Sequence, residues 1–92
     1  MPKMVPQRWE TRFGRWAHKV GPARIAAELT RRGFPSSRCA VYNWTAADIP
    51  VPTLKAVCIE RWTRGAVTVR DMERHYQKLR RVRPEIEHGE TI

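Results

Sequence analysis

The segment 21–44 contains two short apolar patterns at helical spacing, separated by a polar turn. The first pattern predicts a helix over 22–32, and the second predicts a helix over about 37–46. Gly33 lies where a left-handed residue commonly ends a helix, and a serine is available to cap the next one. Two helices joined by so short a turn share one core, which constrains the chain to a helical fold. The side chains directed to that core are Ile25, Ala26, Leu29, Ala40, Val41 and Trp44.

Three further helices are predicted around this segment, so the expected fold class is all-α, with five helices and no strand. One of them covers 6–20, and another covers 52–64 and is closed by Gly65. Phe34 is expected to pack into the core beneath the turn. The apolar faces of these two helices are Trp9, Phe13, Trp16, Ala17 and Val20 on the first, and Leu54, Val57, Cys58 and Trp62 on the second.

The last predicted helix covers 69–82 and begins with a capping box formed by Thr68 and Asp71. Its apolar positions form one seam, which docks either on the domain's own core or on a second copy of the chain. A contact between two copies is favoured, because the other four helices already suffice for a compact core. The expected domain is 1–83, followed by an acidic tail over 84–92. The seam consists of Val69, Met72, Tyr76 and Leu79.

The positive net charge of the chain favours a negatively charged partner. The 92 residues carry a formal net charge of +9, and three of the nine acidic residues lie in the 84–92 tail, which has no Lys or Arg. The rest of the chain therefore holds 18 basic groups against six acidic ones, or +12. Nucleic acid is the plainest partner, and an anionic membrane is a weaker one because no helix joins a basic face to a wide exposed apolar face. One basic stripe is either a solvated face or a phosphate contact: Arg8, Arg12, Arg15 and Lys19.

Several function classes are not expected. No apolar run is long enough to cross a membrane, and the first ten residues lack the apolar stretch of a signal peptide, so a cytoplasmic location is expected. Cys39 and Cys58 lie in apolar helical patterns and are expected to be buried free thiols. The chain has no paired Cys or His motif, no nucleophile with a base and no glycine-rich phosphate loop. We therefore expect no metal, no cofactor, no small-molecule ligand and no enzymatic activity.

The helix predicted over 37–46 carries the candidate site. The positions between its core residues point away from the core and are available to a partner. This is the arrangement that a helix-turn-helix needs to place a recognition helix in a groove of DNA. The side chains at these positions are Ser37, Arg38, Cys39, Tyr42 and Asn43.

These patterns resemble the Cro/repressor-type helix-turn-helix regulators of phages and bacteria, in particular the small Cro-like and YdaS-type proteins. The resemblance covers about residues 21–72. The chain departs from the family's pattern in the turn, which the residues 30–35 lengthen. The likeness rests on Ile25-Ala26-Ala27-Glu28-Leu29, on Val41-x-x-Trp44, and on the stretches 49–52, 59–61 and 65–68.

The resemblance implies a role for each matching position. Arg38 would read a guanine edge, and Asn43 suits adenine. Ser37 and Tyr42 would reach bases or phosphates, although Tyr42 alternatively packs against a later helix. Cys39 either meets a thymine methyl group or is buried. Contacts to the DNA backbone are expected from Ser36, Arg24, Thr45 and Lys55, and from Arg31 and Arg32, which alternatively only complement the dipole of their helix.

The function expected from these features is sequence-specific binding of double-stranded DNA by a transcriptional regulator. It would be a repressor that binds an inverted repeat as a homodimer, with recognition helices about 34 Å apart. A phage or prophage regulator and an operon autorepressor both fit this description. The alternative is a protein-interaction module, such as an antitoxin or host modulator, that binds an acidic protein through its basic surface or through the seam of the last helix. RNA binding is a weaker idea, because the aromatic residues are expected in the core.

Overall fold

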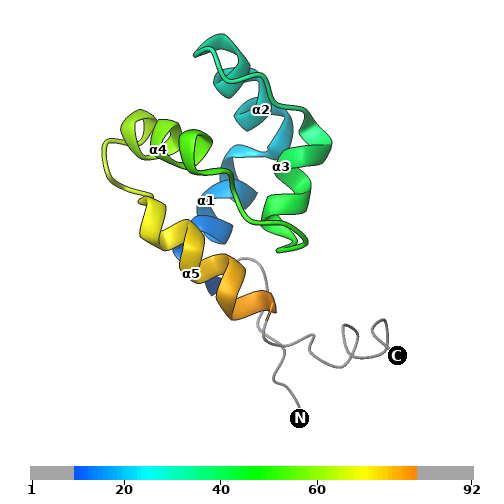
Figure 1. Cartoon of the computed structure of the whole chain (residues 1–92), viewed down its shortest axis with the longest axis vertical. Helices are drawn as coiled ribbons and strands as arrows, with labels where there is room; N and C mark the ends of the chain where they lie inside the picture. Colours follow the sequence, from blue (N-terminus) through cyan, green and yellow to red (C-terminus); the bar gives the residue numbers. More distant parts are fainter. Residues whose placement is uncertain (1–9, 81–92) are drawn as a thin grey trace.

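A computed structural model describes residues 10–80, and helices joined by short loops make up this part of the chain (Figure 1). It contains five α-helices and no strand, which confirms the predicted all-α class. The expectations for Trp9, for Arg8 and for the acidic tail 84–92 lie outside the described residues. The helices are α1 Arg12–Val20, α2 Pro22–Arg31, α3 Arg38–Thr45, α4 Thr53–Trp62 and α5 Val69–Arg80.

The first helix begins later than predicted. Thr11 has an extended backbone (φ −96°, ψ 161°), and its hydroxyl accepts a hydrogen bond from the N–H of Gly14 at 2.9 Å. Thr11 is therefore the N-cap of α1, and a capping residue is not itself helical. The prediction of a continuous helix from residue 6 is wrong at Glu10 and Thr11, because helical spacing of apolar residues does not by itself mark where a helix starts.

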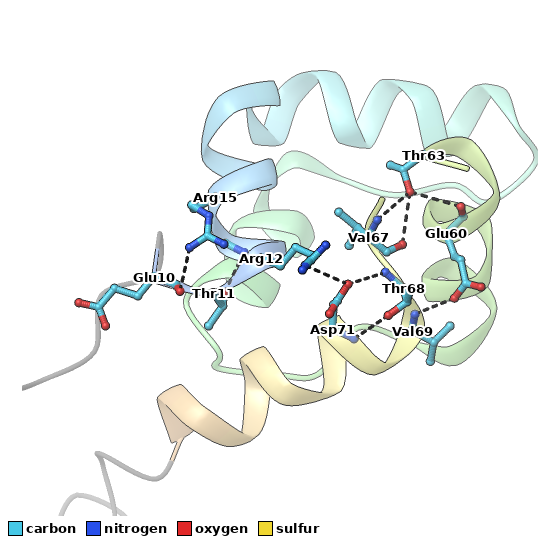
Figure 2. A network of polar contacts seen from close by, with 11 residues as sticks. Glu10, Thr11, Arg12, Arg15, Glu60, Thr63, Val67, Thr68, Val69 and Asp71 are labelled. Carbon is cyan, nitrogen blue, oxygen red and sulfur yellow. Dashed lines mark hydrogen bonds and ion pairs between the residues drawn. The ribbon is translucent and has the colours of Figure 1, made fainter. Parts of the chain in front are cut away.

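Side chains also cap α3 and α5. The Ser37 hydroxyl accepts from the N–H of Ala40 at 3.0 Å, which makes Ser37, and not Ser36, the cap of α3. The Thr68 N–H donates to the Asp71 carboxylate at 2.9 Å, and the Asp71 N–H donates to the Thr68 hydroxyl at 3.0 Å (Figure 2). The predicted capping box is thereby confirmed.

The end of α2 explains the lengthened turn. Gly33 has a φ of 99°, in the left-handed region where glycine carries no steric cost. The N–H groups of Gly33 and Phe34 donate to the carbonyls of Thr30 at 3.1 Å and Leu29 at 2.8 Å. These two bonds form a Schellman motif, which satisfies the last carbonyls of the helix. The predicted role of Gly33 is confirmed, and Phe34 packs against the core as expected.

Two more helices end in the same pattern with a residue other than glycine in the left-handed position. Ala47 holds this position after α3, with a φ of 63°. Arg64 holds it after α4, with a φ of 56°, and the Gly65 N–H then donates to the carbonyl of Glu60 at 2.9 Å. Gly65 also has a positive φ, but the residue that reverses the chain first is Arg64.

The core lies where α1, α3 and α5 meet, since each of these helices contacts the other two. In addition, α2 packs on α1 and α3, and α4 packs on α2 and α5 (Figure 1). The apolar positions predicted for the first three helices are largely buried, and Trp16, Val20 and Ala40 line the edge of the core. The buried members are Phe13, Ala17, Ile25, Ala26, Leu29, Val41 and Trp44.

The predicted inner face of α4 is wrong at Leu54, which is 70% exposed. The helix buries Ala56, Cys58 and Ile59 instead, while Trp62 is partly buried against the core. Leu54 lies five residues before Ile59, which is about 140° around a helix, so one face cannot bury both side chains. Ile59 is completely buried and thereby determines the face.

The apolar seam of α5 packs inside the chain. Met72 and Leu79 are buried, and Val69 lies against the edge of the core. Tyr76 is half-buried, with the Arg80 guanidinium 5.5 Å from the centre of its ring. The argument for a contact between two copies through this seam is therefore wrong, because α5 already has partners in α1, α3 and α4.

Candidate nucleic-acid interface

The outer face of α3 presents the side chains that the sequence singles out. Arg38, Cys39 and Tyr42 are exposed, Tyr42 to 48%, and Asn43 is half-buried. These four residues and Pro22 line a hollow of about 260 Å³ beside the start of α2. The hollow joins a guanidinium, a carboxamide, a phenol and a thiol on one surface, which is a mixture of hydrogen-bonding and apolar groups.

Below this surface, α3 is held firmly by the core. Val41 is completely buried, and Trp44 is 2% exposed. The Ser37 hydroxyl accepts from the backbone at the start of the helix, so its proton and one lone pair remain for other partners. The predicted division of α3 into an inner apolar face and an outer polar face is therefore confirmed.

The start of α2 lies against the same hollow through Pro22. This helix has no side-chain cap, and its first turn holds no acidic residue. Arg24 is exposed in that first turn. The first N–H groups of an uncapped helix, together with an arginine, favour an anion such as a phosphate.

The loop between α2 and α3 is closed by its own hydrogen bonds. The Thr30 hydroxyl accepts from the Ser36 N–H at 3.1 Å and donates to the Ser36 carbonyl at 3.3 Å. The Ser36 hydroxyl donates to the carbonyl of Phe34 at 2.9 Å. Ser36 was predicted to contact a phosphate, and its backbone and side chain are instead engaged in holding the loop.

Lys55 also holds this loop. Its ammonium group donates to the carbonyl of Pro35 at 2.9 Å and lies 5.7 Å from the centre of the Trp44 ring. The contact ties α4 to the loop that precedes α3. The sequence predicts that Lys55 contacts the DNA backbone, but in the structure its ammonium group is engaged in this internal contact.

The two arginines at the end of α2 share one carboxylate. Arg31 and Arg32 both pair with Glu28, at 2.5 Å and 2.6 Å. The hydrogen bonds from Arg31 and then from Arg32 lower the pKa of Glu28 from 4.5 to about 2, and Glu28 raises the pKa of Arg31. Arg32 also lies 5.8 Å from the centre of the Trp62 ring. Both arginines are exposed, but part of their charge is neutralised.

The prediction that Thr45 contacts the DNA backbone is wrong. Thr45 is buried, and its hydroxyl donates to the carbonyl of Tyr42 at 2.8 Å. This bond back to the preceding turn is a common way for threonine to satisfy its hydroxyl inside a helix. The side chain therefore points into the molecule and not toward a partner.

His75 is the buried polar residue that sequence reasoning missed. It is 1% exposed, with Nδ1 2.5 Å from the Thr11 hydroxyl and Nε2 2.9 Å from the Thr45 carbonyl. Its ring also meets Phe13 edge to face, with ring centres 5.1 Å apart. One side chain of α5 thus fixes the first residue before α1 and the last turn of α3. Its position between Met72 and Leu79 on the apolar seam was the available signal.

The two cysteines lie in different environments. Cys58 is buried, as predicted, but Cys39 is exposed, so the expectation of a second buried thiol is wrong. Cys39 is one turn before Asn43 and shares the outer hollow with it, whereas Val41 and Trp44 occupy the inner face. The apolar pattern of this short helix is too narrow to include position 39.

Comparison of the chain with known protein families, with curated proteins and with solved structures finds no match. The resemblance to Cro-like and YdaS-type regulators therefore stays a prediction. Among the helices within residues 10–80, none combines the length and the apolar character that a membrane span requires.

Proposed function

We propose that this chain binds double-stranded DNA with sequence preference and acts as a transcriptional regulator, with α3 as its recognition helix. The observation that carries the proposal is the outer face of α3, where Arg38, Cys39, Tyr42 and Asn43 surround one hollow. The net charge of +9 supports a polyanionic partner. In this account the regulator works in the cytoplasm and represses transcription by occupying a promoter.

The dimensions of α3 are compatible with the major groove. An α-helix with its side chains is about 10–12 Å across, and the major groove is about 12 Å wide. Arg38 supplies the planar fork that pairs with the O6 and N7 atoms of guanine, and Asn43 supplies the amide that pairs with adenine. Cys39 and Tyr42 add the apolar surface that a thymine methyl group prefers.

The start of α2 supplies the phosphate contacts in this account. The uncapped start of α2 lies next to the hollow through Pro22, and Arg24 is in the same first turn. Phosphate contacts at such a site fix the register of a protein on DNA without reading its sequence. Ser37 is available for the same purpose. Lys55, Ser36 and Thr45 are left out of the interface, because the contacts described above already engage them.

Binding of an inverted repeat by a homodimer stays part of the proposal. A dimer would place two copies of α3 in successive major grooves on one side of the DNA. Its contact surface is not the pair Met72 and Leu79, since both are buried within one chain. The mass of the complex with a single operator, measured by analytical ultracentrifugation, tests this part directly.

Two substitutions separate reading of the sequence from general affinity. We expect Arg38→Ala to remove about 1–3 kcal/mol of discrimination at one base pair, because the bidentate contact to guanine is lost. We expect Arg24→Ala to weaken binding to all duplexes alike. The measurement is competition binding against a set of single-base variants of a bound duplex. Arg61→Ala, an exposed arginine on α4, is the matched control.

The proposal is contradicted if Arg38→Ala keeps the full preference of the wild-type protein. If no duplex from the promoter of its own gene is bound at all, the chain is instead a protein-interaction module, such as an antitoxin or host modulator, that binds an acidic protein.

A further inference from the structure

A second basic surface lies in the groove between α1 and α5. The groove has a volume of about 740 Å³ and is lined by Arg12 and Arg15 on α1, and by Arg74 and Lys78 on α5. Among the described residues that line it, Asp71 is the one carboxylate, and the remaining members, Thr11 and Gln77, are uncharged and polar. Two rows of cations therefore face each other across a groove.

The single carboxylate does not neutralise this groove. Four cations against one carboxylate leave a net charge of +3 among the lining residues. Asp71 is largely engaged with the backbone N–H of Thr68, and it lies 3.9 Å from the Arg12 guanidinium (Figure 2). The Arg12 side chain is 65% exposed, so this ion pair is weak and leaves most of the guanidinium accessible.

The other three cations are also accessible. Arg15 donates to the carbonyl of Glu10 at 3.1 Å through one nitrogen, which orients its guanidinium and leaves further N–H groups for a ligand. Arg74 and Lys78 are exposed and lie one turn apart on α5. They therefore project from the same side of that helix.

The chemistry of the lining favours phosphates over a protein surface. No apolar or aromatic residue is among the described residues that line the groove. The affinity of most protein–protein interfaces comes from a few aromatic or aliphatic anchors in their centre, and this groove offers no pocket of that kind. Arginine forks that flank an open groove match the oxygens of successive phosphates.

The groove and the hollow on the outer face of α3 are separate surfaces that share no lining residue. The described residues that line the groove come from α1, from α5 and from Thr11 just before α1, and none of them belongs to α3. The outer face of α3, for its part, is the one turned away from the buried Val41 and Trp44. The two surfaces can therefore hold two different duplex segments.

We propose that the groove between α1 and α5 binds the phosphate backbone of a second DNA duplex without sequence preference, so that one chain bridges two duplex segments. Binding in the groove stands by itself, whereas bridging also rests on the proposed function of α3. The chain would then hold its operator with one surface and bring a neighbouring segment close with the other.

The test measures bridging with the full chain. A short duplex of mixed sequence is fixed to beads, the protein is added, and capture of a second duplex with a fluorescent label is recorded. The groove variant is Arg74→Gln with Lys78→Gln, and the control is Arg61→Gln with Arg64→Gln, which removes the same charge from exposed positions elsewhere. The α3 variant is Arg38→Ala with Asn43→Ala. Light scattering gives the mass of each variant.

We expect the groove variant to lose at least about tenfold in capture, and the control to keep it. Each phosphate contact releases counterions and contributes about −0.9 to the slope of log K against log salt concentration, where K is the association constant for a duplex. Loss of two contacts in the groove variant should therefore make this slope shallower by about 1.8. The α3 variant should still bind single duplexes through the groove but capture no second one. If it captures normally while the groove variant fails, the groove is supported, but capture then joins the grooves of two copies and the bridging role of α3 is wrong; the competition assay with Arg38→Ala decides the proposed function of α3 separately.

Three results would overturn the inference. The first is wild-type capture and an unchanged salt dependence in the groove variant, which would leave the proposed function of α3 intact. The second is a loss of capture together with a change of mass, which would make the groove a contact between copies. The third is binding of polyglutamate, but not of duplex, that depends on Arg74 and Lys78, which would make the partner an acidic protein.

Discussion

His75 connects three helices through a chain of hydrogen bonds whose direction can be assigned. The Thr45 carbonyl can only accept, so Nε2 of His75 carries the proton and donates to it. In the neutral imidazole, Nδ1 then accepts from the Thr11 hydroxyl, whose oxygen in turn accepts from the Gly14 N–H. Every polar atom of this buried chain has a partner, which is the condition for a buried polar group to be tolerated.

Replacing the imidazole of His75 by an apolar side chain of similar size should therefore still destabilise the fold. We expect His75→Leu to lower the free energy of unfolding by about 2–4 kcal/mol, since it leaves the Thr45 carbonyl and the Thr11 hydroxyl without their buried partner. Urea titration monitored by circular dichroism measures the change. Gln77→Leu on the exposed side of α5 is the control and should stay within about 0.5 kcal/mol of wild type. A His75→Leu variant that is equally close to wild type would refute this role.

Glu28 makes part of the stability dependent on pH. Its pKa is lowered from 4.5 to about 2 by Arg31 and then Arg32, so the folded state holds the carboxylate charged where the unfolded chain would protonate it. This contribution is fully present above pH 4.5 and is lost as the pH falls toward 2. We expect Glu28→Gln to make the unfolding free energy less sensitive to acid over that interval. Denaturant midpoints measured across the interval test this, and a slope equal to that of wild type would contradict it.

Single residues differ in how well sequence reasoning places them. Ser37, Trp44 and Cys58 are predictable because capping chemistry and burial are local preferences of those residue types. His75 is not, because its partners come from other parts of the chain and no local pattern identifies them. Thr45 is not either, because its burial depends on the packing of other helices, although its hydroxyl bonds within α3. Cys39 was misassigned since a helix of eight residues has only a narrow inner face.

At the scale of the elements, the ends of the helices determine how the chain leaves each helix. The same Schellman pattern ends α2, α3 and α4, and it directs the chain out of each helix at a defined angle. Glycine holds the left-handed position only after α2, at Gly33, whereas Ala47 and Arg64 hold it elsewhere. A residue with a side chain is strained in that conformation.

This difference predicts two opposite effects on stability. A Cβ added at Gly33 meets nothing within 4 Å, so Gly33→Ala should cost about 1 kcal/mol through the backbone alone. Arg64→Gly should raise the free energy of unfolding by on the order of 1 kcal/mol, because Arg64 is exposed and has a φ of 56°. Chemical denaturation of the two variants measures both changes in the free energy of unfolding. Equal signs for the two substitutions would contradict the assignment of the left-handed positions.

The order and type of the five helices were predictable, because each has apolar positions at helical spacing and recognisable start or stop residues. Two features were not. The inner face of α4 depends on which of Leu54 and Ile59 reaches the core, and only the packed structure decides that. The docking of α5 depends on His75, whose polar ring interrupts the apolar seam in the sequence.

At the scale of the whole molecule, two separate surfaces around one small core carry basic residues, Arg38 on one and four cations on the other. The outer face of α3 offers side chains that can distinguish bases, and the described residues that line the groove between α1 and α5 are four cations, one carboxylate and two uncharged polar residues. Composition alone predicts a polyanionic partner but does not divide the charge between surfaces. The division follows from the packing of α1, α3 and α5 against one another.

The central claim is that α3 reads DNA sequence, and selection of bound duplexes from a random pool tests it most directly. We predict that the wild-type chain enriches an inverted repeat, and that Arg38→Ala loses the preference for a guanine at one position of each half-site. A pool that shows no enriched sequence, or an Arg38→Ala variant that selects the same sequence as wild type, would contradict the claim.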